Sequence, residues 1–387
     1  MDENKHILKN IYEINTAVYL NRLGRKYQRA MTLATIPDEE IDEIASFGMD
    51  TIWLMGVWQR SPMAIDVSLH DENLLTEIRE ALPDFETEDM IGSAYAIKNY
   101  VVAEQLGGNP ALQQFRERLA NRDINLILDF VPNHTALDNI WVDVHTEYYV
   151  QANSAVVELN PNWYRTLNNI NVALGRDPNY PPWSDTAQLN AFSSAYRKES
   201  IATLTYLATL CDGVRCDMAM LMVNDTFHGT WGNCVGPAPD SEYWADVIAA
   251  VQATSPEFIF IAESYWGSQL ELINQGFNFC YDKKATDLLI DGDMLAVESH
   301  LNNFTPIVDN LLHFLENHDE KRIAARISDI ESLESVIKFI ISLPGPKLWY
   351  DGQFQGAKIR TPVHIRRSQF EPTNQQVLDL YTRLLHK

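Results

Sequence analysis

Short apolar runs of strand length alternate with helix-length segments along most of this 387-residue chain. Short apolar runs bounded by polar residues are typical of buried strands, whereas apolar positions three and four residues apart are typical of helices. The strand-like runs are IYEINTAVYL (Ile11 to Leu20), MDTIWLMGVW, INLILDF, GVRCD, Phe258 to Ala262, FNFCY, Leu311 to Leu315 and KLWY. The helix-like segments are PDEEIDEIASFG, NPALQQFRERLANRD, Ala195 to Leu210, Glu242 to Ala253, Ala285 to Asn302, Asp329 to Ile341 and Asn374 to Leu385. Strands separated mostly by helices over this length predict a (β/α)8 TIM barrel in the α/β class.

Two long segments interrupt this alternation. The first follows Trp58, and the second runs from Thr135 to about Asp185, where Asn, Pro, Trp and Tyr are frequent and no clear period is present. Connections of this length usually contribute to function and seldom serve only to join two elements. We therefore predict a barrel formed by residues 1–134 and 188–387, with residues 135–187 as a subdomain inserted after the third strand. The competing fold is an open, doubly wound sheet, but no glycine-rich phosphate loop follows any strand.

Polar side chains cluster where four of the predicted strands end. They are Asn133 and His134 at the third strand, Arg215 and Asp217 at the fourth, Glu263 at the fifth, and Asn317, His318 and Asp319 at the seventh. Such ends share one face of a barrel, where active sites are built. Arg215 and Asp217 project from the same strand face, and alone this pair is also typical of a structural ion pair. Four runs with the same kind of ending indicate a shared site.

The charge balance restricts the classes of partner and substrate that we expect for this chain. The chain has 30 basic and 53 acidic residues, which gives a formal net charge of −23. Such a surface repels phosphate backbones and anionic lipids, so we expect no nucleic-acid partner, no membrane partner and a neutral substrate. The opening MDENKHILKN lacks a signal-peptide pattern and no apolar run approaches ~18 residues, which predicts a cytoplasmic location. The four cysteines have no CxxC spacing, and this favours buried free thiols.

Four motifs at these strand ends resemble the signature regions of the α-amylase family of retaining glycoside hydrolases and transglycosidases. They are DFVPNH (Asp129 to His134), GVRCD (Gly213 to Asp217), AES (Ala262 to Ser264) and ENHD (Glu316 to Asp319), in the family's order. The resemblance extends from the first strand to the last helix. It implies that Asp217 is the nucleophile, Glu263 the general acid/base and Asp319 the stabiliser of the transition state. It also implies sugar contacts from His134, Arg215 and His318, with Tyr95 as an aromatic platform.

The chemistry of these residue types agrees with the resemblance. Hydrolysis with retention needs a nucleophilic carboxylate and a protonated carboxyl group about 5–5.5 Å apart. Asp217 lies beside Arg215, so we expect it in its charged form. Glu263 follows an apolar run and faces other acids, which favours its protonated form. Taken alone, Glu263 is also typical of an acid at a helix start, and Tyr95 and Trp266 are as typical of packing as of sugar binding.

Several positions differ from typical amylases. Leu221 stands where the family has a histidine that binds calcium, and Gln188 stands where it has an aspartate ligand, while Asn133 is the one ligand retained. A hard cation prefers carboxylate oxygens. We therefore expect no metal at the usual calcium site and no cofactor. Met220 replaces a lysine that helps to hold sugar beyond the cleavage point in typical amylases.

Recognition of a chain end also departs from the family pattern. Exo-acting α-glucosidases of the family usually carry an aspartate after the platform tyrosine, where this chain has Ala96. Arg322 matches the arginine that works with that aspartate, so we assign it to substrate binding. Its aspartate partner is absent from this chain. The family normally continues into an antiparallel β domain after the barrel. We expect that domain to be absent from this chain, which stops at Lys387.

Together these features predict a retaining glycosidase that acts on α-glucosidic bonds, most simply α-1,4, of oligo- or polysaccharides. The alternative within enzymes is a transglycosidase, which uses the same carboxylates to pass a glucosyl or maltosyl group to a sugar. A carbohydrate-binding protein without turnover is a further interpretation, against which the intact Asp217, Glu263 and Asp319 argue. The predicted partner is an α-glucan or an oligosaccharide.

Overall fold

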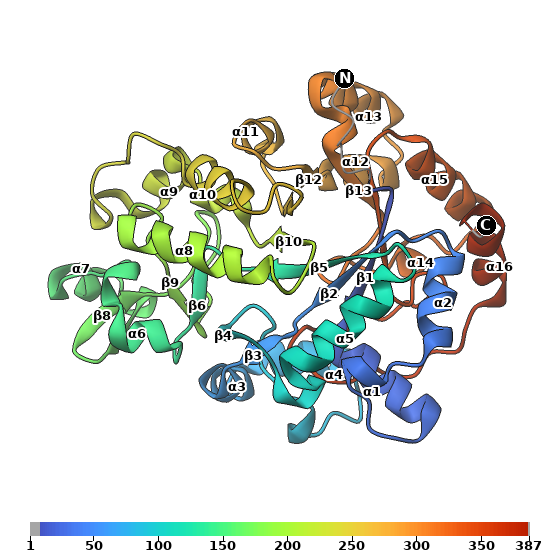
Figure 1. The fold of residues 1–387 in the computed structure, drawn as a ribbon, viewed down its shortest axis with the longest axis horizontal. Helices are drawn as coiled ribbons and strands as arrows, with labels where there is room; N and C mark the ends of the chain where they lie inside the picture. The colour runs from blue at the N-terminus through green and yellow to red at the C-terminus, as the bar shows by residue number, and fades with distance from the viewer. Residues whose placement is uncertain (1–7, 386–387) are drawn as a thin grey trace.

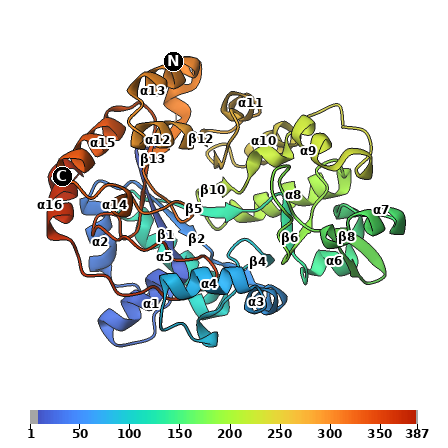
Figure 2. The ribbon, with the colours of Figure 1, turned by 180° about the vertical axis from the view of Figure 1, so that it is seen from behind.

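The computed structural model describes residues 8–385, which form a closed barrel of eight parallel strands surrounded by helices (Figures 1 and 2). The strands are β1 (Asn10–Asn15), β2 (Thr51–Met55), β5 (Asn125–Phe130), β10 (Gly213–Cys216), β11 (Ile259–Ala262), β12 (Phe279–Tyr281), β13 (Leu311–Phe314) and β14 (Lys347–Tyr350). Each strand pairs with the next one in chain order, and β14 closes on β1. The predicted (β/α)8 barrel is therefore confirmed.

Helices follow most of these strands and cover the outside of the barrel (Figure 1). The larger ones are α1 (Thr16–Tyr27), α2 (Asp38–Ser46), α5 (Gly108–Ala120), α8 (Ser194–Leu207), α10 (Tyr243–Gln252), α12 (Lys283–Ile290), α13 (Met294–Asn303), α15 (Ile330–Ser342) and α16 (Gln375–Leu385). Shorter ones are α9 (Asn224–Trp231), α11 (Gln269–Asn274) and α14 (Ile323–Arg326). The long segment after Trp58 contains α3 (Pro62–Leu69) and α4 (Glu72–Ala81), and its ends pair as the antiparallel strands β3 (Trp58–Arg60) and β4 (Ile97–Val102).

The barrel interior is filled by alternate strand residues. Its apolar members include Ile11, Trp53, Ile127, Ile261, Leu312 and Leu348. On β10 the inward positions are Gly213 and Arg215, because side chains alternate along a strand. A Cβ on Gly213 would lie 2.5 Å from the carbonyl oxygen of Ile259 and 2.8 Å from a methyl carbon of Ile127. Glycine at this position therefore lets the neighbouring strands pack closely beneath the Arg215 side chain.

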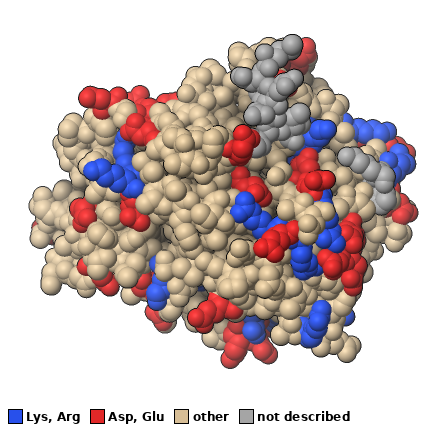
Figure 3. All heavy atoms as spheres, viewed as in Figure 1, with Lys and Arg blue, Asp and Glu red and all other residues tan. Residues whose placement is uncertain are grey.

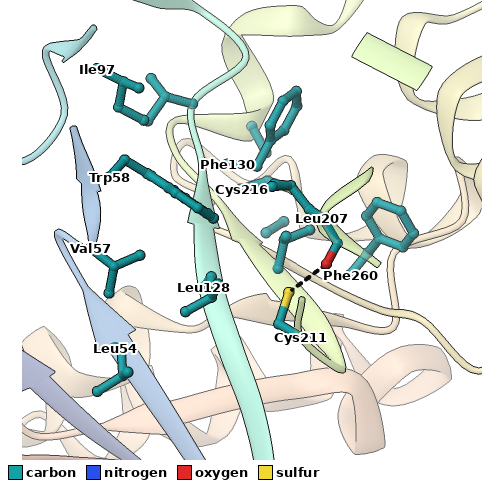
Figure 4. Packing of buried hydrophobic residues seen from close by; sticks show 14 of the residues in the cluster. Leu54, Val57, Trp58, Ile97, Leu128, Phe130, Leu207, Cys211, Cys216 and Phe260 are labelled. Carbon is teal, nitrogen blue, oxygen red and sulfur yellow. Dashed lines mark hydrogen bonds between the residues drawn. The ribbon is translucent and has the colours of Figure 1, made fainter. Parts of the chain in front are cut away.

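A second and larger core lies between the outer faces of the strands and the helices. Figure 4 shows part of it, where Leu128 and Phe130 of β5 and Cys216 of β10 lie among side chains of neighbouring elements. The thiol of Cys211 donates to the carbonyl oxygen of Leu207 at 3.3 Å. All four cysteines are free and three are buried, as predicted from their spacing.

The predicted segment 135–187 follows shortly after β5, and short elements form within it and at its two ends. They are β6 (His134–Ala136), α6 (Ile140–Val144), α7 (Ser154–Leu159), β7 (Tyr164–Leu167), β8 (Ile170–Ala173) and β9 (Thr186–Gln188). β6 and β9 pair antiparallel, so the two ends of the segment lie together, and β7 and β8 form a hairpin. In Figure 1 these elements extend away from the barrel to one side.

Two predicted boundaries are wrong. The first strand was predicted to reach Leu20, but it ends at Asn15, whose side chain accepts a hydrogen bond from the Val18 amide and starts α1. The helix predicted over residues 285–302 is divided into α12 and α13, because Gly292 adopts a φ of 77° and Asp293 caps the second helix. In both cases a side-chain cap overrides the apolar pattern.

Charged side chains of both signs are interspersed on the face shown in Figure 3, mainly towards the side where the barrel lies, while the middle of that face is largely uncharged. The excess of acids does not form one continuous acidic surface there. Among the helices of residues 8–385, none has both the length and the hydropathy needed to cross a bilayer.

Candidate active site

Arg215 is the centre of the predicted site. Its side chain is 1% exposed, its Nη1 lies 2.7 Å from Oδ1 of Asp217, and its Nη2 lies 2.9 Å from Oε2 of Glu263. Nη1 also lies 3.6 Å from Oδ1 of Asp129 on β5. The rings of Trp53, Tyr95 and Tyr281 surround the guanidinium, with centroids 5.2, 5.3 and 5.6 Å from its carbon. One permanently charged group thus joins carboxylates from three neighbouring strands.

Asp217 follows β10 directly, and its amide donates to the carbonyl oxygen of Phe130 at 2.9 Å. Burial raises the pKa of the Asp217 carboxyl, while the charge of Arg215 and its hydrogen bond lower it; the net shift is upward. The sequence had predicted a stabilised anion from the neighbouring arginine alone. Arg215 acts in the predicted direction, but burial, which the sequence did not reveal, outweighs it.

Glu263 follows β11 and has donors at both of its carboxyl oxygens. Oε2 accepts from the backbone amide of Met218 at 2.6 Å, and Oε1 accepts from the Tyr265 hydroxyl at 2.8 Å. Met218 adopts a left-handed conformation with φ 44°, unusual for a side chain of this size. Burial, together with the charges of Asp217 and Asp319, raises the pKa of Glu263 to about 7, although Arg215 opposes the rise. Such a pKa suits a general acid at neutral pH.

Asp319 lies beyond β13 and is more open to solvent than the other two carboxylates. Its side chain is 45% exposed, compared with 9% for Asp217 and 4% for Glu263. Oδ2 of Asp319 lies 2.9 Å from Nε2 of His318. Burial would raise the pKa of Asp319, but the His318 cation outweighs it and lowers that pKa to about 2. Asp319 therefore stays ionised over the working range of most enzymes.

Tyr95 and His318 lie against each other beside these carboxylates. Their rings are stacked with centroids 5.4 Å apart, and the Tyr95 hydroxyl lies 2.8 Å from Nε2 of His318. Nδ1 of His318 lies 2.6 Å from Oε1 of Glu13 on β1. Sequence reasoning missed both Glu13 and Tyr265. Both could have been found in the sequence: Glu13 is a lone acid within an apolar strand run, and Tyr265 lies two residues from a predicted catalytic acid.

His134 begins β6, at the base of the segment 135–187. Its ring centroid lies 5.0 Å from that of Trp183, and burial lowers the pKa of the imidazole to about 3, so the ring is neutral. Trp163 has a different environment, because the Arg176 guanidinium lies between its ring (4.4 Å) and that of Trp231 (4.6 Å). This stack connects the segment to α9.

Arg322, predicted to bind substrate, is engaged by the protein itself. Its Nη1 lies 2.7 Å from Oε1 of Glu316 and 2.9 Å from the carbonyl oxygen of Asp351, and its guanidinium packs on the Tyr350 ring at 4.0 Å. It also lines a cavity of about 550 Å³ between α1 and the chain after β14. These contacts are those of a structural ion pair; its role towards substrate stays a prediction.

The residues at the family's usual calcium position do not fit a cation. Nε2 of Gln188 donates to the carbonyl oxygen and to Oδ1 of Asn133 at 2.9 and 2.8 Å, and to the carbonyl oxygen of Leu189 at 3.0 Å. Amide hydrogens therefore point at the oxygens that would face a metal. Among residues 8–385, no group of three or more His, Cys, Asp or Glu side chains is arranged to hold a metal ion.

A parallel eight-stranded barrel with three carboxylates at the ends of β10, β11 and β13 defines a class, the barrel enzymes that act on glycosides. The family model described as the alpha-amylase catalytic domain matches residues 33–376, and the chain belongs to this family of glycoside hydrolases. Alpha-amylase MalA of Haloarcula japonica is 22% identical over 357 residues, which cover 90% of this chain and 44% of that protein. The chain thus spans about half the length of this curated relative.

Solved structures share the fold. An alpha-amylase from Lactobacillus plantarum superimposes with a TM-score of 0.67 at 20% identity, covering 97% of this chain and 79% of that one. The ligand-free cyclic alpha-maltosyl-(1→6)-maltose hydrolase from Arthrobacter globiformis gives a TM-score of 0.67 at 18% identity, covering 98% and 82%. At these identities the likeness shows the common barrel, and the activity has to be argued from the site.

Proposed function

We propose that this chain is the catalytic domain of a retaining glycosidase that hydrolyses α-glucosidic bonds, most simply α-1,4, of oligo- or polysaccharides. The observation that carries the proposal is the single Arg215 guanidinium, which forms ion pairs with Asp217 at 2.7 Å and with Glu263 at 2.9 Å. Two carboxyl groups on one planar cation are close neighbours, and a retaining mechanism needs a separation of about 5–5.5 Å. The names of the relatives, amylases and a maltosyl-maltose hydrolase, support an α-glucan substrate.

The proposed reaction has two displacements. Asp217 attacks the anomeric carbon while Glu263 gives its proton to the glycosidic oxygen, which leaves with the aglycone. Glu263, now ionised, takes a proton from a water molecule, and the resulting hydroxide replaces Asp217 at the anomeric carbon. The ionised Asp319 stabilises the positive charge that develops on the sugar in both steps. A Glu263 pKa of about 7 supports the double role, because both protonation states are then within reach.

The same proposal assigns the surrounding residues. Tyr95 lies under the reacting sugar, with His134, Arg215 and His318 as hydrogen-bonding partners of its hydroxyl groups. The segment 135–187 acts as a subdomain that walls one side of the site, because it leaves the barrel directly at His134.

Proton NMR of the first products tests the mechanism, because a retaining enzyme releases the α-anomer before mutarotation. The substrates to be tested are maltose, maltooligosaccharides, isomaltose, sucrose and trehalose. Chromatography of the products separates hydrolysis from transfer, because transfer yields products longer than the substrate. Release of the β-anomer first would refute the retaining assignment.

Asp217→Asn tests the nucleophile. An amide has nearly the same size as the carboxylate but cannot form the glycosyl ester, so we expect a loss of several orders of magnitude in kcat. Asp212→Asn is the matched control, since it removes a carboxylate at the other end of β10, where Asp212 bonds Arg116 at 2.6 Å. If Asp217→Asn keeps more than about a tenth of the rate, the nucleophile is misassigned.

A further inference from the structure

Glu13 is a fully buried carboxylate that the mechanism above does not use. It lies on β1, and its backbone is in register with Trp53 of β2 and Tyr350 of β14. A glutamate is almost never buried to this degree without a partner. Among residues 8–385, its one ion-pair partner is His318, and Oε2 of Glu13 accepts no hydrogen bond. His318 is therefore the one cation among these residues within ion-pair distance of this carboxyl group.

His318 is held by Glu13 on one side of its ring and by Asp319 on the other. Oε1 of Glu13 lies 2.6 Å from Nδ1 and 3.3 Å from the backbone nitrogen of His318. Nε2 lies 2.9 Å from Oδ2 of Asp319 and 2.8 Å from the Tyr95 hydroxyl. A neutral imidazole has one protonated nitrogen, so it would turn a lone pair towards one of the two carboxylates. Only the doubly protonated ring donates to both.

We propose that Glu13 is a positioning residue of the active site, which holds His318 as a cation so that its Nε2–H fixes the carboxylate of Asp319. The inference rests on the proposed function, in which Asp319 stabilises the transition state. Glu13 also cancels the charge of the His318 cation, so the pair adds no net positive charge beside an oxocarbenium-like centre. Without Glu13, the buried ring either loses its proton and releases Asp319, or remains a cation with one partner fewer.

The titration of His318 supports this geometry. Burial lowers the pKa of the imidazole, but Asp319 and Glu13 outweigh it and raise that pKa to about 10. The other ionisable groups that face the ring are Tyr95, Asp129 of β5 and Asp217 at the end of β10. Glu13 is in turn faced by further groups, which are Tyr281, Tyr350 and Glu316. Because carboxylates remain around the ring, removal of Glu13 lowers the pKa of His318 without restoring the value of a free histidine.

Histidine-labelled protein and nitrogen NMR give the direct test. The His318 signals are identified by their absence in His318→Gln, and in the wild type we expect a doubly protonated ring at pH 7–8. Glu13→Gln keeps the shape and the acceptor oxygen but removes the charge, so we expect the His318 pKa to fall by at least about one unit. We expect kcat to fall by about tenfold or more with KM changed less than about threefold, because the lost interaction acts in the transition state.

Two further variants separate positioning from stability. Glu13→Asp keeps the charge, so it should keep His318 protonated and recover part of kcat. Asp351→Asn is the matched control, because Asp351 is another buried carboxylate bonded to β1, through the Tyr12 hydroxyl at 2.9 Å. It should leave the His318 titration unchanged even if it lowers stability.

Each outcome decides the proposal. A neutral His318 at pH 7 in the wild type overturns it without any variant, so a Glu13→Gln protein that fails to fold does not prevent the test. An unchanged His318 titration in Glu13→Gln, or a lowered pKa with unchanged kcat, also overturns it. If the wild type hydrolyses no α-glucoside, the proposed function fails and the positioning role with it, while a cationic His318 still upholds the Glu13–His318 ion pair.

Discussion

The replacement of Gln188 by leucine tests whether an amide network fills the place of the usual cation. Gln188 is fully buried at the end of β9. Its Nε2 donates to three oxygens, two of Asn133 and one of Leu189, and its Oε1 accepts from Nδ2 of Asn133 at 3.2 Å and from the Arg176 amide at 3.3 Å. Leucine has nearly the same size but can replace none of these bonds.

The cost follows from the groups left without partners. The Asn133 carbonyl keeps its bond from the Leu189 amide at 2.9 Å, so the uncompensated groups are Oδ1 of Asn133, the carbonyl oxygen of Leu189 and the backbone amide of Arg176. At about 1–3 kcal/mol for each buried unsatisfied group, Gln188→Leu should cost about 3–4 kcal/mol. With an unfolding entropy of about 2 cal/mol/K per residue, that corresponds to a melting point lowered by about 4–5 °C.

Thermal unfolding with and without excess EGTA is the assay. We expect the chelator to leave the wild-type melting point and activity unchanged, because amide hydrogens already satisfy the oxygens that a cation would need. Gln353→Leu is the control: Gln353 is a buried glutamine with fewer bonds, to the Tyr381 hydroxyl and the Tyr350 amide, so it should cost about half as much. A wild-type melting point lowered by ~5 °C or more in EGTA, or no loss in Gln188→Leu, would refute the reasoning.

Two further predictions follow from the site. Because Glu263 must be protonated to donate and its pKa is raised to about 7, kcat/KM should fall about tenfold per pH unit above that pH. On the acid side the fall should begin at a higher pH than an exposed aspartate nucleophile would give, because burial raises the pKa of Asp217. A profile that is flat from pH 5 to 9 would contradict these assignments. Trp183→Ala should change the preferred oligosaccharide length more than stability, whereas Trp163→Ala, which removes one side of the Arg176 stack, should lower the melting point and leave the product pattern unchanged. Chromatography of the products and melting curves for both variants check this, and a reversed pattern would show that the two rings have been assigned the wrong roles.

Much of the fold and part of the site could be predicted from local patterns. Each barrel strand is a buried apolar run, and its position follows from periodicity because alternate residues face either the interior or the helices. Arg215 and Asp217 were expected on one strand face, and the structure joins them at 2.7 Å. The end of the first strand was not predictable in this way, since the residues after Asn15 suit a strand or a helix and the cap decides between them.

The tertiary structure decided the partners and charges of these groups. Glu13 and His318 are 305 positions apart, so their contact exists only because β14 closes the barrel on β1. The pairing of β10 with β5 and β11 brings Arg215 to Asp129 and Glu263 as well as to Asp217, and packing of the barrel buries Asp217, so its pKa rises although the neighbouring arginine lowers it. Sequence periodicity reports which face of an element is apolar, whereas desolvation and Coulomb energy depend on distances between elements, and those are set when the chain packs.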